Sequence, residues 1–503
     1  MNERATVVAT TTLAVVAALG LPAAVVALLE LASMHMSMAF EPFDTAILRH
    51  AADKAGCENM ISMSKEALAI ETARLLKAHG YIALLVGGCV RDRLLGQAPK
   101  DYDIATDACP EQIVTLFPNA RLVGAHFGVV MIPGQEGDDV EVATFRSDHS
   151  YSDGRRPMRV EFESDPRQDV LRRDFTINAL LQDPETGEVF DYVDGQQDLR
   201  DRVVRAIGNP ERRFEEDHLR MLRAIRFAAR FGFTIEPQTF AAIQRLASKI
   251  CAISAERIRD ELVRILTEGG ARRGLELIDQ SGLLAEILPE VKAMQGVEQP
   301  PQYHPEGDVW THTLLMFDKL GKTTPTLAMG VLLHDVGKPA TFRVAERIRF
   351  DGHVEAGVEI AKRILTRLKF SRRDCDQILA LIEHHMRFKD VQQMRESTVK
   401  RFLRLPQFDE HLELHRVDCL SSHGLLDNWN LMREKMESLP TEELRPVRLL
   451  NGRDLISAGF APGPAFAGAL DAVETAQLEG QIHTKQEALE LAQNHLKHAP
   501  ASS

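Results

Sequence analysis

Two aspartates one residue apart, Asp101 and Asp103, are the side chains of this sequence best suited to chemistry. They flank Tyr102 in a pattern typical of a β-strand, and alternate residues of a strand point to the same face. Two neighbouring carboxylates repel each other unless a cation lies between them. Mg²⁺ prefers oxygen ligands and is usually held by one or two carboxylates together with substrate phosphates. We therefore predict a magnesium site at Asp101 and Asp103.

A glycine pair, Gly87 and Gly88, follows an apolar run at 84–86 that predicts a buried strand. Glycines leave backbone amides open to an approaching phosphate. Arg91 lies in the short helix expected after this turn. The strand, the glycine pair, a spacer and then two carboxylates form a far more specific pattern than an Asp-x-Asp pair alone, which a solvated strand end also produces. The pattern indicates a triphosphate-binding site.

Glu141 is a third candidate carboxylate. It lies between apolar neighbours in the run from Val140 to Phe145, which predicts a strand. On that strand it either faces Asp101 and Asp103 as a third catalytic carboxylate or is an exposed glutamate. The sequence leaves both interpretations open.

Two more motifs follow, Arg172-Arg173-Asp174-Phe175-Thr176-Ile177-Asn178-Ala179 and Glu216-Asp217-His218-Leu219-Arg220-Met221-Leu222-Arg223. Together with the glycine pair and the two aspartates, they resemble the class II tRNA nucleotidyltransferases (CCA-adding enzymes) and the related bacterial poly(A) polymerases. The resemblance runs from about residue 60 to about residue 500. It implies an α/β nucleotidyltransferase head with a small mixed sheet and helices, followed by an all-α neck, an HD domain and a tail.

The domains expected from this resemblance are a head at 60–200, a helical base-reading and RNA-binding neck at 201–288, an HD domain at 289–430 and a C-terminal helical tail at 431–503. The implied reaction adds C and A residues to the 3′ end of tRNA from CTP and ATP, without a template, and releases pyrophosphate. The implied cofactor of the head is Mg²⁺, and the implied location is cytoplasmic. No protein partner is evident.

A predicted helix from Pro210 to Phe231 carries Asp217 and Arg220 on one face, three residues apart. Without context, such a face is usually a solvated row of ion pairs. Cytosine and adenine, however, both present an amino group beside an unprotonated ring nitrogen, so a carboxylate and a guanidinium together can accept both bases. Guanine and uracil invert that pattern. The resemblance therefore implies a nucleotide-binding set of Gly87, Gly88, Arg91, Arg172, Arg173, Asp174, Asn178, Asp217, Arg220, Arg223 and Arg226.

A second constellation consists of His312, the pair His334-Asp335, and the distant Asp418. Single histidines on apolar helices are more often core residues than ligands. In this order, however, the four residues resemble the HD phosphohydrolase domain. Imidazole and carboxylate ligands with open positions suit a divalent transition metal that activates water. Many tRNA nucleotidyltransferases carry a degenerate copy of this set, whereas this chain has all four residues.

The composition is that of a globular chain of several domains, with 503 residues, 44% apolar and 26% charged. The net charge of -13 means that any RNA contact must come from local basic surfaces. The six cysteines show no C-x-x-C pair, which argues against a zinc ribbon or a disulfide framework and fits a reducing cytosol.

Residues 1–35 are apolar and do not match the remainder. From Ala5 to Leu29 there is no charge, a length sufficient to span a bilayer. The segment is a membrane anchor, a signal peptide, or translated upstream sequence outside the working protein. A signal peptide is the least favoured, because cytosolic nucleotides and tRNA require no export. Membrane contact is expected only if 5–29 is a genuine anchor.

Three other functions remain open. A poly(A) polymerase is the nearest rival, although the stretch from Gly124 to Gly128 lacks the basic pair that follows this glycine in the polymerases. An enzyme that adds only CC or only A would carry the same motifs. The chain could also act mainly as an HD phosphohydrolase on nucleotides or RNA ends, with its head retained for RNA binding.

Overall fold

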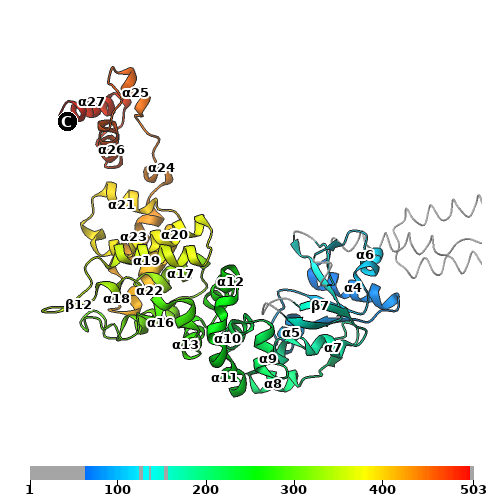
Figure 1. Ribbon diagram of the computed structural model, residues 1–503. Helices are drawn as coiled ribbons and strands as arrows, with labels where there is room; N and C mark the ends of the chain where they lie inside the picture. The colour runs from blue at the N-terminus through cyan, green and yellow to red at the C-terminus, as the bar shows by residue number, and fades with distance from the viewer. Residues whose placement is uncertain (1–62, 124–127, 135–136, 152–156, 499–503) are drawn as a thin grey trace, which may run out of the picture.

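The structure is a computed structural model that describes residues 63–123, 128–134, 137–151 and 157–498 (Figure 1). The predictions for residues 1–35, and most of the stretch at 124–128, fall outside these ranges. Within them, no helix has both the length and the apolar character needed to cross a membrane.

The head is built on a seven-stranded mixed sheet, in which only β2 and β5 run parallel as neighbours. Figure 1 shows this sheet in blue and teal with its flanking helices. In spatial order the strands are β3 (Arg121–Leu122), β4 (Val129–Ile132), β5 (Val140–Thr144), β2 (Asp103–Thr106), β1 (Ala83–Val86), β8 (Leu181–Gln182) and β9 (Val189–Phe190). The accompanying helices are α4 (Lys65–Ala78), α5 (Gly88–Leu94), α6 (Pro110–Leu116), α7 (Pro166–Leu171), the 3₁₀ turn η3 (Thr176–Asn178) and α8 (Gly195–Asp201), and a separate hairpin pairs β6 (Arg146–Tyr151) with β7 (Pro157–Phe162).

The glycine turn between β1 and α5 depends on Gly87. Its φ of 76° lies in the left-handed region that side chains disfavour. A Cβ at this position would lie 3.5 Å from Nη1 of Arg173. The turn therefore brings backbone directly against a guanidinium, as expected at a phosphate-binding site.

The neck is helical, with one short parallel pair between β10 (Val203–Val204) and β11 (Thr234–Ile235). Its helix α10 packs on both α12 and α13, and α12 in turn packs on α17 of the next region. The helices are α9 (Pro210–Glu216), α10 (Arg220–Phe231), α11 (Pro237–Leu246), the 3₁₀ segment η4 (Ala247–Ala252), α12 (Ala255–Thr267), α13 (Ala271–Gln280), α14 (Leu283–Ile287) and α15 (Pro289–Lys292), and α17 is Pro325–Leu333.

The prediction of one continuous helix from Pro210 to Phe231 is wrong. The chain leaves the helix at Asp217, whose φ of -150° and ψ of 106° are extended. The Asp217 carboxylate accepts the backbone N–H of Leu219 at 3.1 Å, and α10 starts one residue later. Short polar side chains favour such breaks because they satisfy amides that would otherwise lack a partner.

The third region is an all-helical bundle except for a small antiparallel hairpin of β12 (Arg343–Val344) and β13 (Ile348–Arg349). Figure 1 shows β12 projecting from the bundle. Besides α17, its helices are α16 (Val309–Lys319), α18 (Lys338–Thr341), α19 (His353–Arg367), α20 (Arg372–His384), the 3₁₀ segment η5 (His385–Gln393), α21 (Glu396–Leu403), α22 (Phe408–Ser421) and α23 (Asp427–Ser438).

The tail ends in a small unit with its own core, from Leu450 to Ala492. It consists of α25 (Gly452–Ser457), α26 (Ala465–Leu478) and α27 (Lys485–His498), and the short α24 (Thr441–Leu444) leads to it (Figure 1). Helix α26 contacts α21 of the bundle, where Arg401 lies 2.9 Å from Asp471 and Arg404 2.6 Å from Glu474. By contrast, one cluster of buried apolar side chains runs without interruption from Leu68 in the head through Leu262 in the neck to Val417 in α22.

Candidate active sites

The first site is a cavity of about 620 Å³ between the head and the neck. The sequence-predicted residues of the head come together here, with the exception of Glu141. They line it from the β1–α5 turn, β2, the segment around 172–178 and α10. The predicted residues in its wall are Gly87, Gly88, Arg91, Asp101, Asp103, Arg172, Arg173, Asp174, Asn178, Asp217, Arg220, Arg223 and Arg226.

Two carboxylates, Asp101 and Asp103, line this cavity, and a third, Glu141, lies beside Asp103 outside its wall. Asp103 pairs in register with Glu141 on the neighbouring parallel strand, so both side chains lie on the same face of the sheet. Burial, followed by the negative charge of Glu141, raises the pKa of Asp103 to about 6. Asp101 lies two residues before the start of β2 and not on the predicted strand; it is exposed, and Lys65 contacts its Oδ1 at 2.8 Å. The arrangement concentrates negative charge where a divalent cation would relieve it.

Arginines next to these carboxylates are held in place by buried aspartates. Arg172 and Arg173 both contact Asp169, at 2.6 and 2.8 Å. Arg223 contacts Oδ2 of Asp174 at 2.6 Å. Their guanidinium groups are thus positioned before any ligand binds, which lowers the entropic cost of gripping phosphate oxygens.

Asp174 is fully engaged within the protein. Its Oδ1 accepts the backbone N–H of Phe175 at 2.8 Å and the side-chain amide of Asn178 at 3.3 Å. Burial would raise the pKa of Asp174, but the guanidinium groups of Arg223 and Arg220 lower it to about 2. In this geometry Asp174 acts by positioning Arg223.

Arg91 and Arg226 are the most buried arginines of the wall. Arg91 donates to Asn178 Oδ1 at 2.5 Å and lies over the ring of Phe231 at 4.6 Å. Arg226 contacts Glu261 on α12 at 2.7 Å. The contact of Arg91 with Phe231 joins the head to the neck, and that of Arg226 with Glu261 joins two helices of the neck.

The proposed base-reading pair lies in the same wall, and each member has its own partner. Asp217 is held by Arg257 of α12, which sequence reasoning missed because no local pattern links residues 40 positions apart. Arg220 contacts Glu216 at 2.7 Å and donates to the carbonyl of Arg172 at 3.1 Å. The carboxylate of Asp217 and the guanidinium of Arg220 are therefore each held in place by a different partner.

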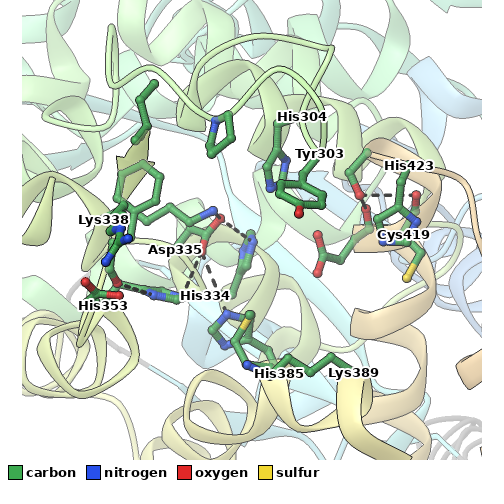
Figure 2. Close-up of a pocket in the computed structure, with 18 of the residues that line it drawn as sticks. Tyr303, His304, His334, Asp335, Lys338, His353, His385, Lys389, Cys419 and His423 are labelled. Atoms are coloured by element: carbon green, nitrogen blue, oxygen red, sulfur yellow. Dashed lines mark hydrogen bonds and ion pairs between the residues drawn. The ribbon is translucent and has the colours of Figure 1, made fainter. Parts of the chain in front are cut away.

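The second site is a cavity, also of about 620 Å³, in the helical bundle (Figure 2). Three groups of potential metal ligands lie at or beside it within the described residues, each with its ligand atoms within 4.8 Å of one another: His304, Glu306 and His312, and two groups that contain an aspartate. One is His312, His334 and Asp418, and the other is Asp335, His353 and His385. All four sequence-predicted HD residues thus converge. His353 and His385, which lie outside the predicted set of four, join Asp335 in the last of these groups.

The histidine rings present lone pairs to the aspartates. Nδ1 of His334, His353 and His385 lies 2.6–2.9 Å from a backbone carbonyl, which places the ring proton on Nδ1. Their buried Nε2 atoms make no hydrogen bond within the described residues. Each faces an oxygen of Asp335 instead, at 3.1, 3.8 and 3.9 Å (Figure 2).

His312 completes the set with a different orienting partner. Its Nδ1 contacts Glu306 at 2.7 Å, and its Nε2 lies 3.1 Å from Asp418. Burial lowers the pKa of His312, but the carboxylates of Asp418 and Glu306 outweigh it and raise the pKa to about 9. In His385, burial prevails and lowers the pKa to about 4. Lone pairs facing carboxylates in a buried space are what a divalent cation would bind.

Comparison with known proteins gives the family. A model of the poly(A) polymerase head domain matches residues 83–205, a probable RNA- and SrmB-binding site of polymerase A matches 232–295, and an HD domain matches 308–421. A CCA-adding enzyme of Streptococcus pneumoniae is 31% identical over 84% of this chain and 95% of its own length. The chain belongs to the family of CCA-adding enzymes. A multifunctional CCA protein of Halorhodospira halophila is 40% identical over 62% of this chain and 76% of its own length.

Solved structures of CCA-adding enzymes share the fold. The Bacillus stearothermophilus enzyme in complex with CTP matches 85% of this chain and 97% of its own, with a TM-score of 0.66 and 28% identity. The Thermotoga maritima enzyme complexed with tRNA matches 86% and 95%, with a TM-score of 0.52 and 19% identity. The predicted family and the predicted mixed-sheet head with a mostly helical remainder are confirmed.

Proposed function

We propose that this chain adds CCA to the 3′ end of tRNA from CTP and ATP. The observation that carries the proposal is a single cavity lined both by the Asp101/Asp103 pair and by Asp217 and Arg220. A carboxylate pair suited to nucleotidyl transfer and a pair suited to base selection therefore meet at one nucleotide-sized space. CTP, ATP and tRNA are the partners, and we place the reaction in the cytoplasm.

In the reaction, the 3′ oxygen of tRNA bonds to the α-phosphorus, and the bond from that phosphorus to pyrophosphate breaks. Asp101 and Asp103 would hold Mg²⁺, which when bound lowers the pKa of the attacking hydroxyl and neutralises charge on pyrophosphate. Arg172, Arg173 and Arg223 supply fixed positive charge for the phosphates. Glu141 does not line the cavity, so we assign it a supporting electrostatic role through Asp103.

Base selection would follow from Asp217 and Arg220. The carboxylate accepts from the exocyclic amino group of cytosine or adenine, and the guanidinium donates to the adjacent ring nitrogen. A carbonyl and a ring N–H, as in uracil and guanine, would clash with both. By analogy with base-edge readout, each good bidentate contact discriminates by about 1–3 kcal/mol.

The test is incubation of the protein with tRNA lacking its 3′ end and with each labelled nucleotide separately, followed by sequencing of the products. Sequential incorporation of two C and one A supports the proposal. Addition of CC alone, of A alone or of a poly(A) run would instead identify a CC-adding enzyme, an A-adding enzyme or a poly(A) polymerase. Absence of incorporation would refute a nucleotidyltransferase.

We also propose a metal-dependent phosphohydrolase activity for the second site. Its support is the set of buried Nε2 atoms of His334, His353 and His385 aimed at Asp335, with His312 beside Asp418. His312, His334, Asp335 and Asp418 would hold a divalent transition metal, and His353 and His385 are further potential ligands beside Asp335. A metal bound there lowers the pKa of a water ligand.

This second activity is tested with phosphate esters and cyclic nucleotides in the presence of Mg²⁺, Mn²⁺, Co²⁺ or Ni²⁺. Metal-dependent hydrolysis that His334→Ala abolishes supports the proposal. If the wild type hydrolyses nothing with any of the four ions, the proposal is refuted.

A further inference from the structure

The β12–β13 hairpin forms part of the wall of the HD cavity. Arg347, Ile348, Arg349 and Phe350 all line that cavity. The base of the hairpin is packed in place: the rings of Phe342 and Phe350 lie 5.9 Å apart, and Nζ of Lys338 lies 5.3 Å from the Phe350 ring centre.

The two arginines of this wall carry uncompensated charge. Within the described part of the chain, neither Arg347 nor Arg349 forms an ion pair, and both are exposed. Arg347 lies in the turn of the hairpin and Arg349 on β13, and both line the cavity. Lys389 of η5 also lines the cavity. Of the nearby carboxylates, Glu346 lies in the hairpin turn but does not line the cavity, whereas Asp351 follows the hairpin and does.

The position of these cations differs from that of Lys338. Lys338 contacts Asp335 at 2.6 Å and therefore belongs to the centre itself. Arg347 and Arg349 contact none of the six ligand residues. Free guanidinium groups in the wall, away from the ligands, suit a phosphate other than the one that reacts.

We propose that the β12–β13 hairpin is a phosphate-binding arm. It selects ribonucleotide substrates that carry a second phosphate group beyond the reacting one, as the last internucleotide phosphate of an RNA end does. The inference rests on the proposed phosphohydrolase. In that reaction a water oxygen bonds to the reacting phosphorus, the phosphoester bond breaks, and the leaving oxygen takes a proton. The arm binds the neighbouring phosphate throughout.

The experiment compares two probes on the full chain loaded with Ni²⁺ or Mn²⁺. One is a nucleoside 2′,3′-cyclic phosphate, with one phosphate, and the other is a dinucleotide ending in the same cyclic phosphate, with two. The variant is Arg347→Gln/Arg349→Gln. The matched control is Arg343→Gln, because Arg343 is exposed on the same hairpin, opposite Arg349, but does not line the cavity.

The double variant should lose at least ~10-fold in kcat/KM for the dinucleotide and less than ~2-fold for the mononucleotide, since the lost contacts are charge-assisted. The salt dependence of dinucleotide binding should also weaken, by roughly 0.7 in log–log slope for each arginine. The control should behave as the wild type. An equal loss of kcat/KM on both probes, or no loss on either, would refute the proposal that the hairpin is a phosphate-binding arm.

Failure of the hydrolase itself is recognised separately. If the wild type cleaves neither probe, the phosphohydrolase proposal falls, and the arm is judged from equilibrium binding of the labelled dinucleotide. A loss of affinity of ~5-fold or more in the double variant, with none in Arg343→Gln, upholds the arm as an RNA-phosphate contact. Unchanged affinity refutes it.

Discussion

The carboxylate of Asp217 is held by two nitrogens of Arg257, with Nη2 at 2.7 Å from Oδ2 and Nη1 at 3.3 Å from Oδ1. Arg257 lies on α12, and Asp217 lies at the break before α10. The orientation of the proposed base acceptor is thus set by a different helix from the one that carries the proposed donor. Base selection should respond to changes in α12 that never touch the nucleotide.

We expect Asp217→Ala to alter nucleotide discrimination. It removes the acceptor for the amino group and the charge that repels a carbonyl, so CTP and ATP should lose efficiency while UTP loses much less or gains. The change in relative efficiency should be about 5- to 150-fold, for a contact of about 1–3 kcal/mol. Incorporation of all four triphosphates on tRNA ending before CCA measures it. If all four fall equally, Asp217 does not read the base.

Arg257→Ala should weaken the same discrimination without removing the carboxylate. Freed from Arg257, Asp217 samples several rotamers, so relative UTP incorporation should rise, by less than in Asp217→Ala. Arg257→Lys should restore part of the selectivity. Arg264→Ala is the matched control, since Arg264 is on the same helix and in the same cavity wall but does not contact Asp217. An identical change in selectivity in the control would contradict the role of Arg257.

Asp101→Ala and Asp103→Ala should each abolish nucleotide addition while leaving the protein folded and able to bind tRNA. The reason is that each removes one of two ligands for the catalytic cation. Activity is measured by primer extension, folding by circular dichroism and tRNA binding by filter retention. Normal incorporation by either variant would refute the metal assignment. Glu141→Ala should be milder, because Glu141 acts only through the charge of Asp103.

Metal binding at the head should depend on pH through Asp103. Its pKa of about 6 means that the side chain is protonated below pH 6 and ionised above it. Protons therefore compete with the cation at low pH, and Mn²⁺ affinity at pH 5 should be roughly tenfold weaker than at pH 7. Electron paramagnetic resonance measures free Mn²⁺. In Asp103→Asn, the Mn²⁺ affinity should be lower and should lose this dependence on pH. A wild-type Mn²⁺ affinity that is the same at pH 5 and pH 7 would contradict the prediction.

His334→Ala should lower the amount of transition metal bound to the protein, measured by elemental analysis. It should also remove phosphohydrolase activity and leave CCA addition unchanged. His384→Ala is a suitable control, because His384 adjoins His385 in sequence but belongs to none of the ligand groups. Loss of CCA addition in His334→Ala, with folding intact, would show that the two sites are not independent.

Local sequence patterns predicted the parts of the site whose structure is set by residues close together in the sequence. The buried run of β1 and the turn at Gly87 are properties of adjacent residues, so periodicity and residue type were enough. The strand expected to carry both aspartates begins only at Asp103, so Asp101 lies just before it. The HD residues were found because a histidine, a His-Asp pair and a later aspartate are distinctive as a set.

Contacts that depend on packing were not predictable from those patterns. The helix break at Asp217 follows from a side chain that caps its own backbone, which competes with a helical periodicity that looks continuous. Arg257 reaches Asp217 only because α12 packs on α10. The orienting role of Glu306 likewise depends on the fold bringing it against His312.

The uninterrupted apolar cluster from Leu68 to Val417 has a consequence for proteolysis and truncation. Because α12 packs on α17, ending the chain near Leu288 would expose the apolar face that α12 buries against the bundle. Such a shortened protein should aggregate or unfold, even though residues 63–288 contain the whole nucleotide cavity. Limited digestion should instead cut first between α23 and α25, where the chain passes to a tail with its own core.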